Sequence, residues 1–158
     1  MRKPLILFSL LVFALGTAIW SMVPSPTQTA SAEQSLDLVE GKQQYQDYCA
    51  SCHGANLEGQ PDWRSVGPDG ILPAPPHDET GHTWHHSDSA LFDYTKLGGA
   101  EALARQGVDF QSGMPGFGDQ LTDSEIRNIL AFISSTWPDR QRDVQATRSS
   151  TERDQLDN

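Results

Sequence analysis

The sequence has few of the features that would support a cross-linked, sheet-based or nucleic-acid-binding protein. Its two cysteines, Cys49 and Cys52, are too few and too close together for a disulfide framework to hold the fold. Basic residues are scarce: 11 Lys and Arg face 21 Asp and Glu, and the net charge of -10 repels phosphate backbones. With this charge we do not expect the protein to bind nucleic acid. Alternating strand patterns are absent, so we expect an all-α protein. The 158 residues suffice for one compact domain.

The long apolar run of the sequence lies at its N-terminus. Residues 1–32 contain Arg2 and Lys3, no acidic residue and the run Leu5–Ile19, which together are typical of an export signal. The small residues Ala30-Ser31-Ala32 predict cleavage at the end of this segment. The alternative is an uncleaved membrane anchor over residues 5–23, which at about 1.5 Å per residue just crosses a hydrocarbon core roughly 30 Å thick. In either case we expect the rest of the chain in the periplasm or on the outer face of the cytoplasmic membrane.

The exported part divides into an acidic domain and a short polar tail. Residues 33–137 hold 5 basic and 16 acidic side chains, a net charge of -11. Residues 138–158 hold 4 basic and 5 acidic side chains, with only Val144 and Leu156 as sizeable apolar residues. A segment with so little apolar surface predicts disorder. We therefore expect one folded domain over 33–137 and a disordered polar tail over 138–158.

Three helices are predicted in this domain. The first begins near Leu38 and runs into Cys49, because Gly41 and two tyrosines recur there at helical spacing. The second spans residues 88–97 and ends at Gly98-Gly99.

The third predicted helix has the clearest start signal. Thr122 and Glu125 form a capping box, and an apolar stripe of isoleucines and a leucine follows at helical spacing. The helix must stop by Trp137 because Pro138 comes next. Between the first two helices, residues 54–87 contain half of the ten prolines and no usable periodicity. A loop of this length fits a compact domain if it wraps a large prosthetic group.

Cys49-Ala50-Ser51-Cys52-His53 has the spacing C-x-x-C-H, the attachment site of c-type haem. At the end of a helix, two cysteines three residues apart can reach both vinyl groups of one porphyrin, and the adjoining His53 can reach the iron. Two other readings are open. A thioredoxin-like redox pair uses C-x-x-C within a strand and helix framework, and a zinc site would have to recruit distant histidines.

Met114 is the second candidate ligand. Beyond the N-terminal segment it is the only methionine, and it lies in a Gly- and Pro-rich stretch, residues 112–118, where Pro115 fixes one backbone angle. A methionine is more often a core filler, but this one has no helical stripe around it. A haem iron that only shuttles electrons keeps both axial positions filled, commonly with Met opposite His.

These motifs, in this order, resemble those of the class I c-type cytochromes, over about residues 36–137. The resemblance implies a small cytochrome c fold, with three to five short helices wrapped around one haem c that Cys49 and Cys52 bind covalently. It implies His53 and Met114 as the axial ligands of the iron. Tyr45, Trp84 and Pro115 are further haem-binding candidates.

The resemblance also implies how the ligand histidine is held. In that family the first and last helices cross at a glycine and an aromatic residue, which Gly41 and Tyr45 would supply. A carbonyl of a proline loop, here within residues 72–76, accepts the Nδ1 proton of the histidine and leaves Nε2 for iron.

Four histidines, His77, His82, His85 and His86, surround Trp84 in a part of the chain that small members of the family lack. One hypothesis is a second metal site for copper or zinc, since imidazole suits both. The other is that Trp84 and one or two of these histidines cover the haem edge and bind its propionates.

Filled axial positions would leave electron transfer as the remaining chemistry. We expect an electron carrier between respiratory or related redox partners, not an enzyme. The acidic surface predicts partners with a basic docking patch, and we expect a monomer. Alternatives are a membrane-tethered cytochrome subunit of a larger oxidoreductase and a cytochrome with an additional His-rich metal site. A two-haem peroxidase is excluded by the single C-x-x-C-H.

Overall fold

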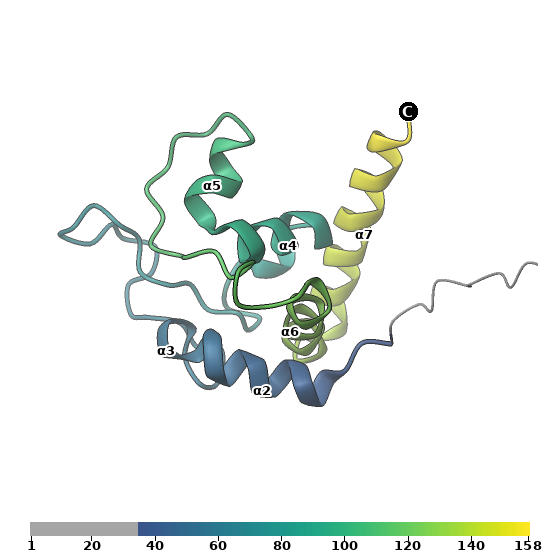
Figure 1. Ribbon diagram of the computed structural model, residues 1–158, viewed down its shortest axis with the longest axis horizontal. Coiled ribbons are helices and arrows are strands. Elements are labelled where there is room, and N and C mark those ends of the chain that lie inside the picture. Colours follow the sequence, from purple (N-terminus) through teal and green to yellow (C-terminus); the bar gives the residue numbers. More distant parts are fainter. Residues whose placement is uncertain (1–34) are drawn as a thin grey trace, which may run out of the picture. The chain divides into compact units, whose positions relative to one another are not determined.

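The computed structural model describes residues 35–158, so the predicted export signal or anchor lies outside the described residues. The described part is built of helices without a strand, which confirms the all-α prediction (Figure 1). No helix in this part of the chain is both long and apolar enough to cross a membrane. The elements are α2 (Leu38–Tyr48), α3 (Ala50–His53), the 3-10 turn η2 (Thr83–His85), α4 (Asp88–Leu97), α5 (Gly99–Ala104), α6 (Asp123–Ser135) and α7 (Asp139–Leu156).

The core lies where α2 crosses α6, as the resemblance implied. A Cβ on Gly41 of α2 would lie 2.0 Å from the backbone oxygen of Asn128 in α6, so only glycine lets the two backbones come this close. One turn further on, Tyr45 is fully buried and its ring packs against Phe132, with 5.6 Å between the ring centroids. The other buried residues of this core are Leu57, Leu121, Ile126, Ile129, Ile133 and Trp137.

Local signals start both helices of this pair. In α6 the predicted capping box is present, because the Thr122 side chain accepts from the Glu125 N–H while the Glu125 carboxylate accepts from the Thr122 N–H. In α2 the Asp37 carboxylate caps the first turn. The Asn128 side chain joins the two helices, since it accepts from the Asp37 N–H and donates to Glu40 at 2.8 Å.

The predicted helix over residues 88–97 is present as α4, and it ends as expected at Gly98. That glycine has a φ of +86° and also precedes the first residue of α5. Helix α5 was not predicted, because the pair Gly98-Gly99 indicates the end of a helix and not the start of another. A Cβ on Gly98 would lie 2.7 Å from the backbone nitrogen of Gly116, so the close approach requires glycine as well as the positive φ.

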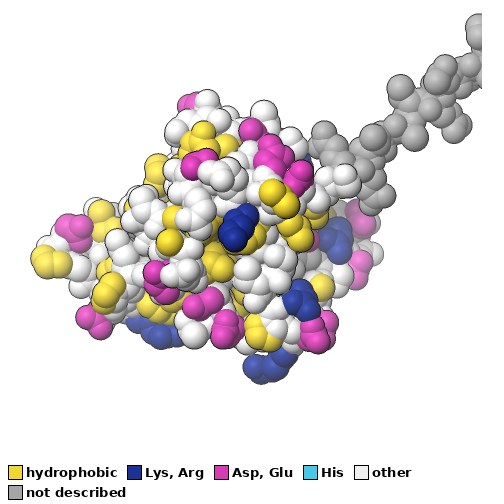
Figure 2. Space-filling model, turned by 90° about the horizontal axis from the view of Figure 1, so that it is seen from below, with side chains coloured by type: hydrophobic (Ala, Val, Ile, Leu, Met, Phe, Trp, Pro, Cys, Tyr) yellow, Lys and Arg dark blue, Asp and Glu magenta, His cyan; other side chains and the backbone are white. Residues whose placement is uncertain are grey.

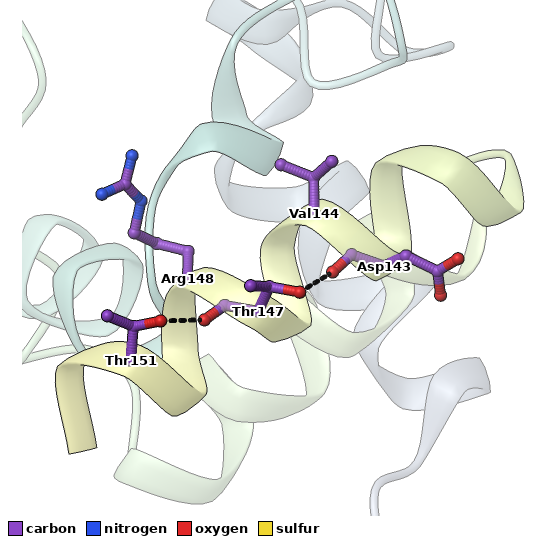
Figure 3. A pocket seen from close by; sticks show the side chains of 5 residues that line it. All are labelled: Asp143, Val144, Thr147, Arg148 and Thr151. Carbon is purple, nitrogen blue, oxygen red and sulfur yellow. Dashed lines mark hydrogen bonds between the residues drawn. The ribbon is translucent and has the colours of Figure 1, made fainter. Parts of the chain in front are cut away.

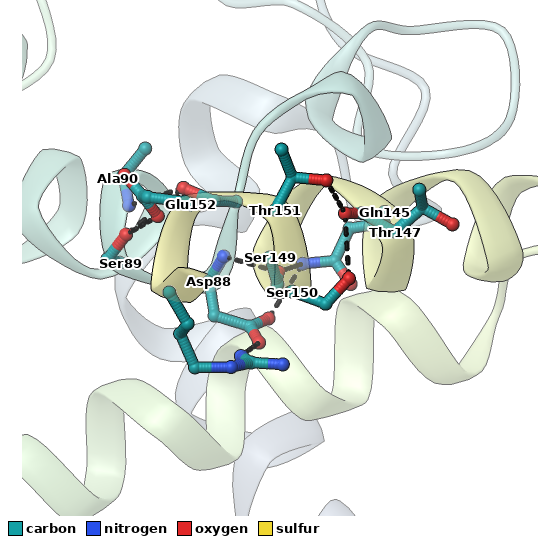
Figure 4. A network of polar contacts seen from close by, with 11 residues as sticks. Asp88, Ser89, Ala90, Gln145, Thr147, Ser149, Ser150, Thr151 and Glu152 are labelled. Carbon is teal, nitrogen blue, oxygen red and sulfur yellow. Dashed lines mark hydrogen bonds and ion pairs between the residues drawn. The ribbon is translucent and has the colours of Figure 1, made fainter. Parts of the chain in front are cut away.

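Helix α7 corrects our prediction of a disordered tail over 138–158. It is an 18-residue helix that packs against α4 and η2, and its two buried residues, Gln145 and Ser149, are polar. The Ser149 hydroxyl accepts a 2.9 Å hydrogen bond from the Asp88 N–H, and Gln145 Nε2 donates to the Asp88 carboxylate at 2.6 Å (Figure 4). Long-range polar pairs, and not an apolar stripe, order this helix. The prediction of disorder was wrong because composition shows only that apolar residues are few.

Further polar contacts hold α7 near its C-terminal end. Ser89 donates to the Glu152 carboxylate, and hydrogen bonds from the Ser87 and Ser89 hydroxyls lower the pKa of Glu152. On another face of α7 a shallow hollow is lined by Asp143, Val144, Thr147, Arg148 and Thr151 (Figure 3). None of the site residues predicted from the sequence lines this hollow.

Candidate haem site

The cysteine pair lies at the junction of α2 and α3. Cys49 ends α2 and is partly buried, Cys52 lies in α3 and is exposed, and the two do not form a disulfide. Burial, and to a smaller extent the neighbouring Cys52, raises the pKa of the Cys49 thiol to about 11. A redox-active C-x-x-C pair needs a thiolate near neutral pH, so this environment does not suit a thioredoxin-like exchange.

His53 is buried directly after the pair, with one orientation of its ring fixed. Its Nδ1 lies 2.8 Å from the carbonyl oxygen of Pro75, and because a carbonyl only accepts, Nδ1 carries the proton. The predicted proline-loop acceptor is therefore Pro75. Burial lowers the pKa of His53, and the hydrogen bond to Pro75 opposes this in part. The neutral ring has its lone pair on Nε2, the atom that can bind a metal.

His77 has a role that sequence reasoning missed. Its ring stacks on that of His53, with 4.0 Å between centroids and 22° between planes. Its Nδ1 lies 2.8 Å from the Thr83 hydroxyl, and its carbonyl accepts a 2.7 Å hydrogen bond from Trp137 Nε1. Burial holds the pKa of His77 well below the ordinary value of 6.5. The available signal was its position directly after Pro75-Pro76, the segment expected to face His53.

Tyr45 supports the motif from inside the core. Its hydroxyl donates to the carbonyl of Gly54, the residue after His53, at 2.8 Å, and burial raises its pKa. Its ring meets His77 edge on, with 6.2 Å between centroids. The hydroxyl is thus used to fix the backbone beside His53, which is a supporting contact rather than one aimed at a cofactor.

The segment of Met114 is bound to the end of α4 and the start of α5. The Met114 carbonyl accepts from the Gly99 N–H at 3.1 Å, and the N–H groups of Phe117 and Gly118 donate to the last turn of α4 at 3.0 and 2.9 Å. Pro115 is exposed between these contacts. The Phe117 ring packs edge on against Tyr48, the residue before Cys49, with 6.1 Å between centroids. This contact links the Met114 segment to the cysteine motif.

Trp84 carries a polar atom that lacks a partner. Its indole Nε1 is buried and makes no hydrogen bond in the described part of the chain. A buried N–H without an acceptor is costly, so the position suits an anionic acceptor such as a carboxylate. Two cysteines outside any disulfide, an imidazole with Nε2 available and this indole N–H together fit a haem with propionate groups.

The histidines around Trp84 do not converge on one point. His77 stacks on His53, His82 on Trp63 at 5.2 Å, and His85 on Trp84 at 3.7 Å. His86 lies 5.4 Å from His82, measured between ring centroids. Within residues 35–158 no three His, Cys, Asp or Glu side chains are arranged to hold a metal ion, so this geometry supports neither a zinc site nor a second metal centre there.

Of three comparisons with known proteins, one found a match, and it agrees with the geometry. No curated protein and no solved structure matches the chain. The family model described as Cytochrome c matches residues 38–137, from the first residue of α2 to the buried Trp137. The chain therefore belongs to the cytochrome c family, and it binds haem c covalently through Cys49 and Cys52.

Proposed function

We propose that this protein is a monohaem electron carrier with His53 and Met114 as the axial ligands of the iron. The observation that carries the proposal is the hydrogen bond from His53 Nδ1 to the Pro75 carbonyl, because it keeps the proton on Nδ1 and leaves Nε2, in the residue directly after Cys52, available to bind iron. Haem supplies a reversible one-electron change between ferrous and ferric iron.

The residues around His53 serve this role by staying fixed. The stacked ring of His77 and the Pro75 carbonyl hold the imidazole of His53 in one orientation. When the iron that His53 would bind gains or loses an electron, these side chains therefore need to rearrange little. The backbone bonds of Met114 to α5 do the same on the other ligand segment. Trp84 would donate its buried N–H to a propionate.

Replacing Met114 tests the ligand assignment. In Met114→Leu we expect the sulfur-to-iron charge-transfer band of the oxidised spectrum to vanish, the reduced protein to bind carbon monoxide, and the midpoint potential to fall. Val39→Leu, on the exposed side of α2, is the control and should behave as wild type. Immediate carbon monoxide binding by the reduced wild-type protein would contradict Met114 ligation and leave room for enzymatic chemistry at the iron.

We further propose that the protein works as a monomer with redox partners that present a basic docking patch. The net charge of -11 over residues 33–137 supports this. Stopped-flow electron transfer to a basic redox protein should slow as ionic strength rises, and an unchanged rate would contradict electrostatic steering.

The proposed location is the periplasm or the outer face of the cytoplasmic membrane. The apolar run at the N-terminus also favours a second candidate, a membrane-tethered subunit of a larger oxidoreductase. Mass spectrometry of the mature protein separates the two. An N-terminus at Glu33 supports the released carrier, and retention of residues 1–32 supports the tethered subunit.

A further inference from the structure

Helix α7 packs against η2, the turn that carries Trp84. The family model matches residues 38–137, so α7, which begins at Asp139, lies outside the matched part of the chain. A helix that the family model does not include thus contacts the segment of a proposed haem contact. This arrangement gives residues beyond the matched domain a route to the haem site.

The segment that carries Trp84 is fixed on its N-terminal side by the surroundings of the proposed ligand. The hydroxyl of Thr83, the residue before Trp84, lies 2.8 Å from His77 Nδ1. The His77 ring in turn stacks on that of His53, with 4.0 Å between centroids. Trp84 therefore directly follows a residue that is tied to the His53 side of the site.

On its C-terminal side the same segment is fixed by α7. Asp88, four residues after Trp84, is bound twice: its N–H donates to the Ser149 hydroxyl at 2.9 Å, and its carboxylate accepts from Gln145 Nε2 at 2.6 Å (Figure 4). Gln145 and Ser149 lie one turn apart on α7, and Gln145 Nε2 also donates to the Ser149 hydroxyl at 3.2 Å. These two buried side chains therefore act on Asp88 as a unit.

The ion pair between α7 and α4 is a weaker contact. Arg153 lies 3.8 Å from the Asp88 carboxylate, and the two side chains are 64% and 70% exposed. Exposed pairs of this kind contribute little to stability. Charged side chains of both signs are also scattered over the face of the molecule shown in Figure 2. The buried pair Gln145 and Ser149 is therefore the main link from α7 to the start of α4.

The Trp84 indole requires an accurate position. Its Nε1 is buried without a partner in the described part of the chain, and an N–H donor needs its acceptor within about 3.2 Å. A small displacement of η2 would carry the indole N–H out of reach of a propionate. The position of this turn, held between His77 and Asp88, therefore decides whether the bond forms.

We propose that Gln145 and Ser149 are positioning residues of the haem site: by holding Asp88 they fix η2 and keep Trp84 Nε1 directed at a haem propionate. The proposal rests on the contact between Trp84 and a propionate proposed above. The negative charge of a propionate favours ferric iron, and a hydrogen-bond donor on the carboxylate weakens that effect. Helix α7 thereby raises the midpoint potential.

The test compares the wild-type holoprotein with Gln145→Ala/Ser149→Ala, with Trp84→Phe and with the variant that combines all three changes. In redox titrations we expect the equilibrium constant for reduction to fall about threefold in each of the first two. The combined variant should show no further fall, because both changes remove the same bond. In NMR spectra of Gln145→Ala/Ser149→Ala, the Trp84 indole proton should exchange with solvent about tenfold faster than in wild type.

The matched control is Ser150→Ala/Thr151→Ala. These hydroxyls lie on the same helix but donate to the Thr147 carbonyl of α7 itself, at 3.0 and 2.8 Å, so the potential and the indole exchange should stay unchanged.

An additive fall in the combined variant would overturn the proposal, because α7 would then act on the iron without Trp84. Unchanged indole exchange in Gln145→Ala/Ser149→Ala, or an equal change in the control, would overturn it as well. A wild-type holoprotein without a reversible one-electron couple would instead contradict the proposed function. The indole exchange would still test the role of α7 in that case, since it requires bound haem and no change of redox state.

Discussion

Two contacts of the last helices differ in kind. Helix α6 meets α2 through a glycine, an aromatic ring and isoleucines, with the backbones almost touching at Gly41. Helix α7 meets α4 and η2 through hydroxyl, amide and carboxylate groups, and it buries only Gln145 and Ser149. Apolar burial stabilises in proportion to area, whereas each polar pair exchanges bonds that water would otherwise make. We expect the first contact to support the whole domain and the second to open independently.

The strongest way to break the α2–α6 contact is Gly41→Ala. The added Cβ would lie 2.0 Å from the Asn128 oxygen, so we expect a loss of about 3 kcal/mol in the free energy of unfolding. Chemical denaturation of the holoprotein measures it. The control Gly107→Ala has nothing within 4 Å of the new Cβ and only its φ of +77° as a cost, about 1 kcal/mol. Equal losses would show that crowding at the crossing is unimportant.

A smaller effect follows from deleting one hydroxyl in the core. Tyr45→Phe keeps the buried ring but leaves the Gly54 carbonyl without its 2.8 Å partner. We expect a loss of about 1.5 kcal/mol, measured by the same denaturation, with the whole domain unfolding as one unit. A loss confined to the segment around Gly54 would contradict a role in the common core.

The equivalent deletion in the other contact is Ser149→Ala. It removes the acceptor of the Asp88 N–H, and we expect a loss of about 1 kcal/mol that is confined to α7 and the first turn of α4. Hydrogen exchange should show faster exchange of α7 amides and unchanged exchange in α6. Ser150→Ala is the control, because that hydroxyl bonds only the Thr147 carbonyl of its own helix. Faster exchange throughout α6 would mean that the two contacts are coupled.

The smallest expected effect is a dependence on pH near α7. Burial lowers the pKa of His82 and of His86 below 6.5, and the charge of Arg148 in α7 contributes to the shift at His86. The unfolded chain therefore takes up protons first as pH falls from 6.5, and stability declines until the folded pKa values are passed. Unfolding curves at pH 7.5 and pH 5 should differ less in His82→Gln/His86→Gln than in wild type. An identical difference would assign the pH dependence to other groups.

The same contrast explains what could be predicted from the sequence. The start of α6 depends on Thr122 and Glu125, three residues apart, and the end of α4 on Gly98, so local patterns were sufficient. The order in α7 depends on Gln145 and Ser149 reaching Asp88 across 57 and 61 positions, which composition does not encode. There the prediction of disorder was wrong.

At the site, the cysteine motif and the need for a proline-loop carbonyl followed from spacing and family resemblance. The choice of Pro75 among the residues 72–76 did not, since it depends on how the loop folds back on α3. The position of His77 was missed for a similar reason. In the sequence it belongs to a group of four histidines around Trp84, but its contacts in space are His53, Thr83 and Trp137.

The bond from Trp137 to the His77 carbonyl has a consequence for the order in which the protein is assembled. His53 lies near the beginning of the domain, yet the residue that stacks on it is fixed by an indole from the end of the domain, 60 positions beyond His77. A chain still emerging during synthesis or export offers the cysteines and the histidine without that support. The enclosure around His53 is therefore complete only once the residues through Trp137 are in place. Haem attached before that point would bind at an open site, which would then close around it.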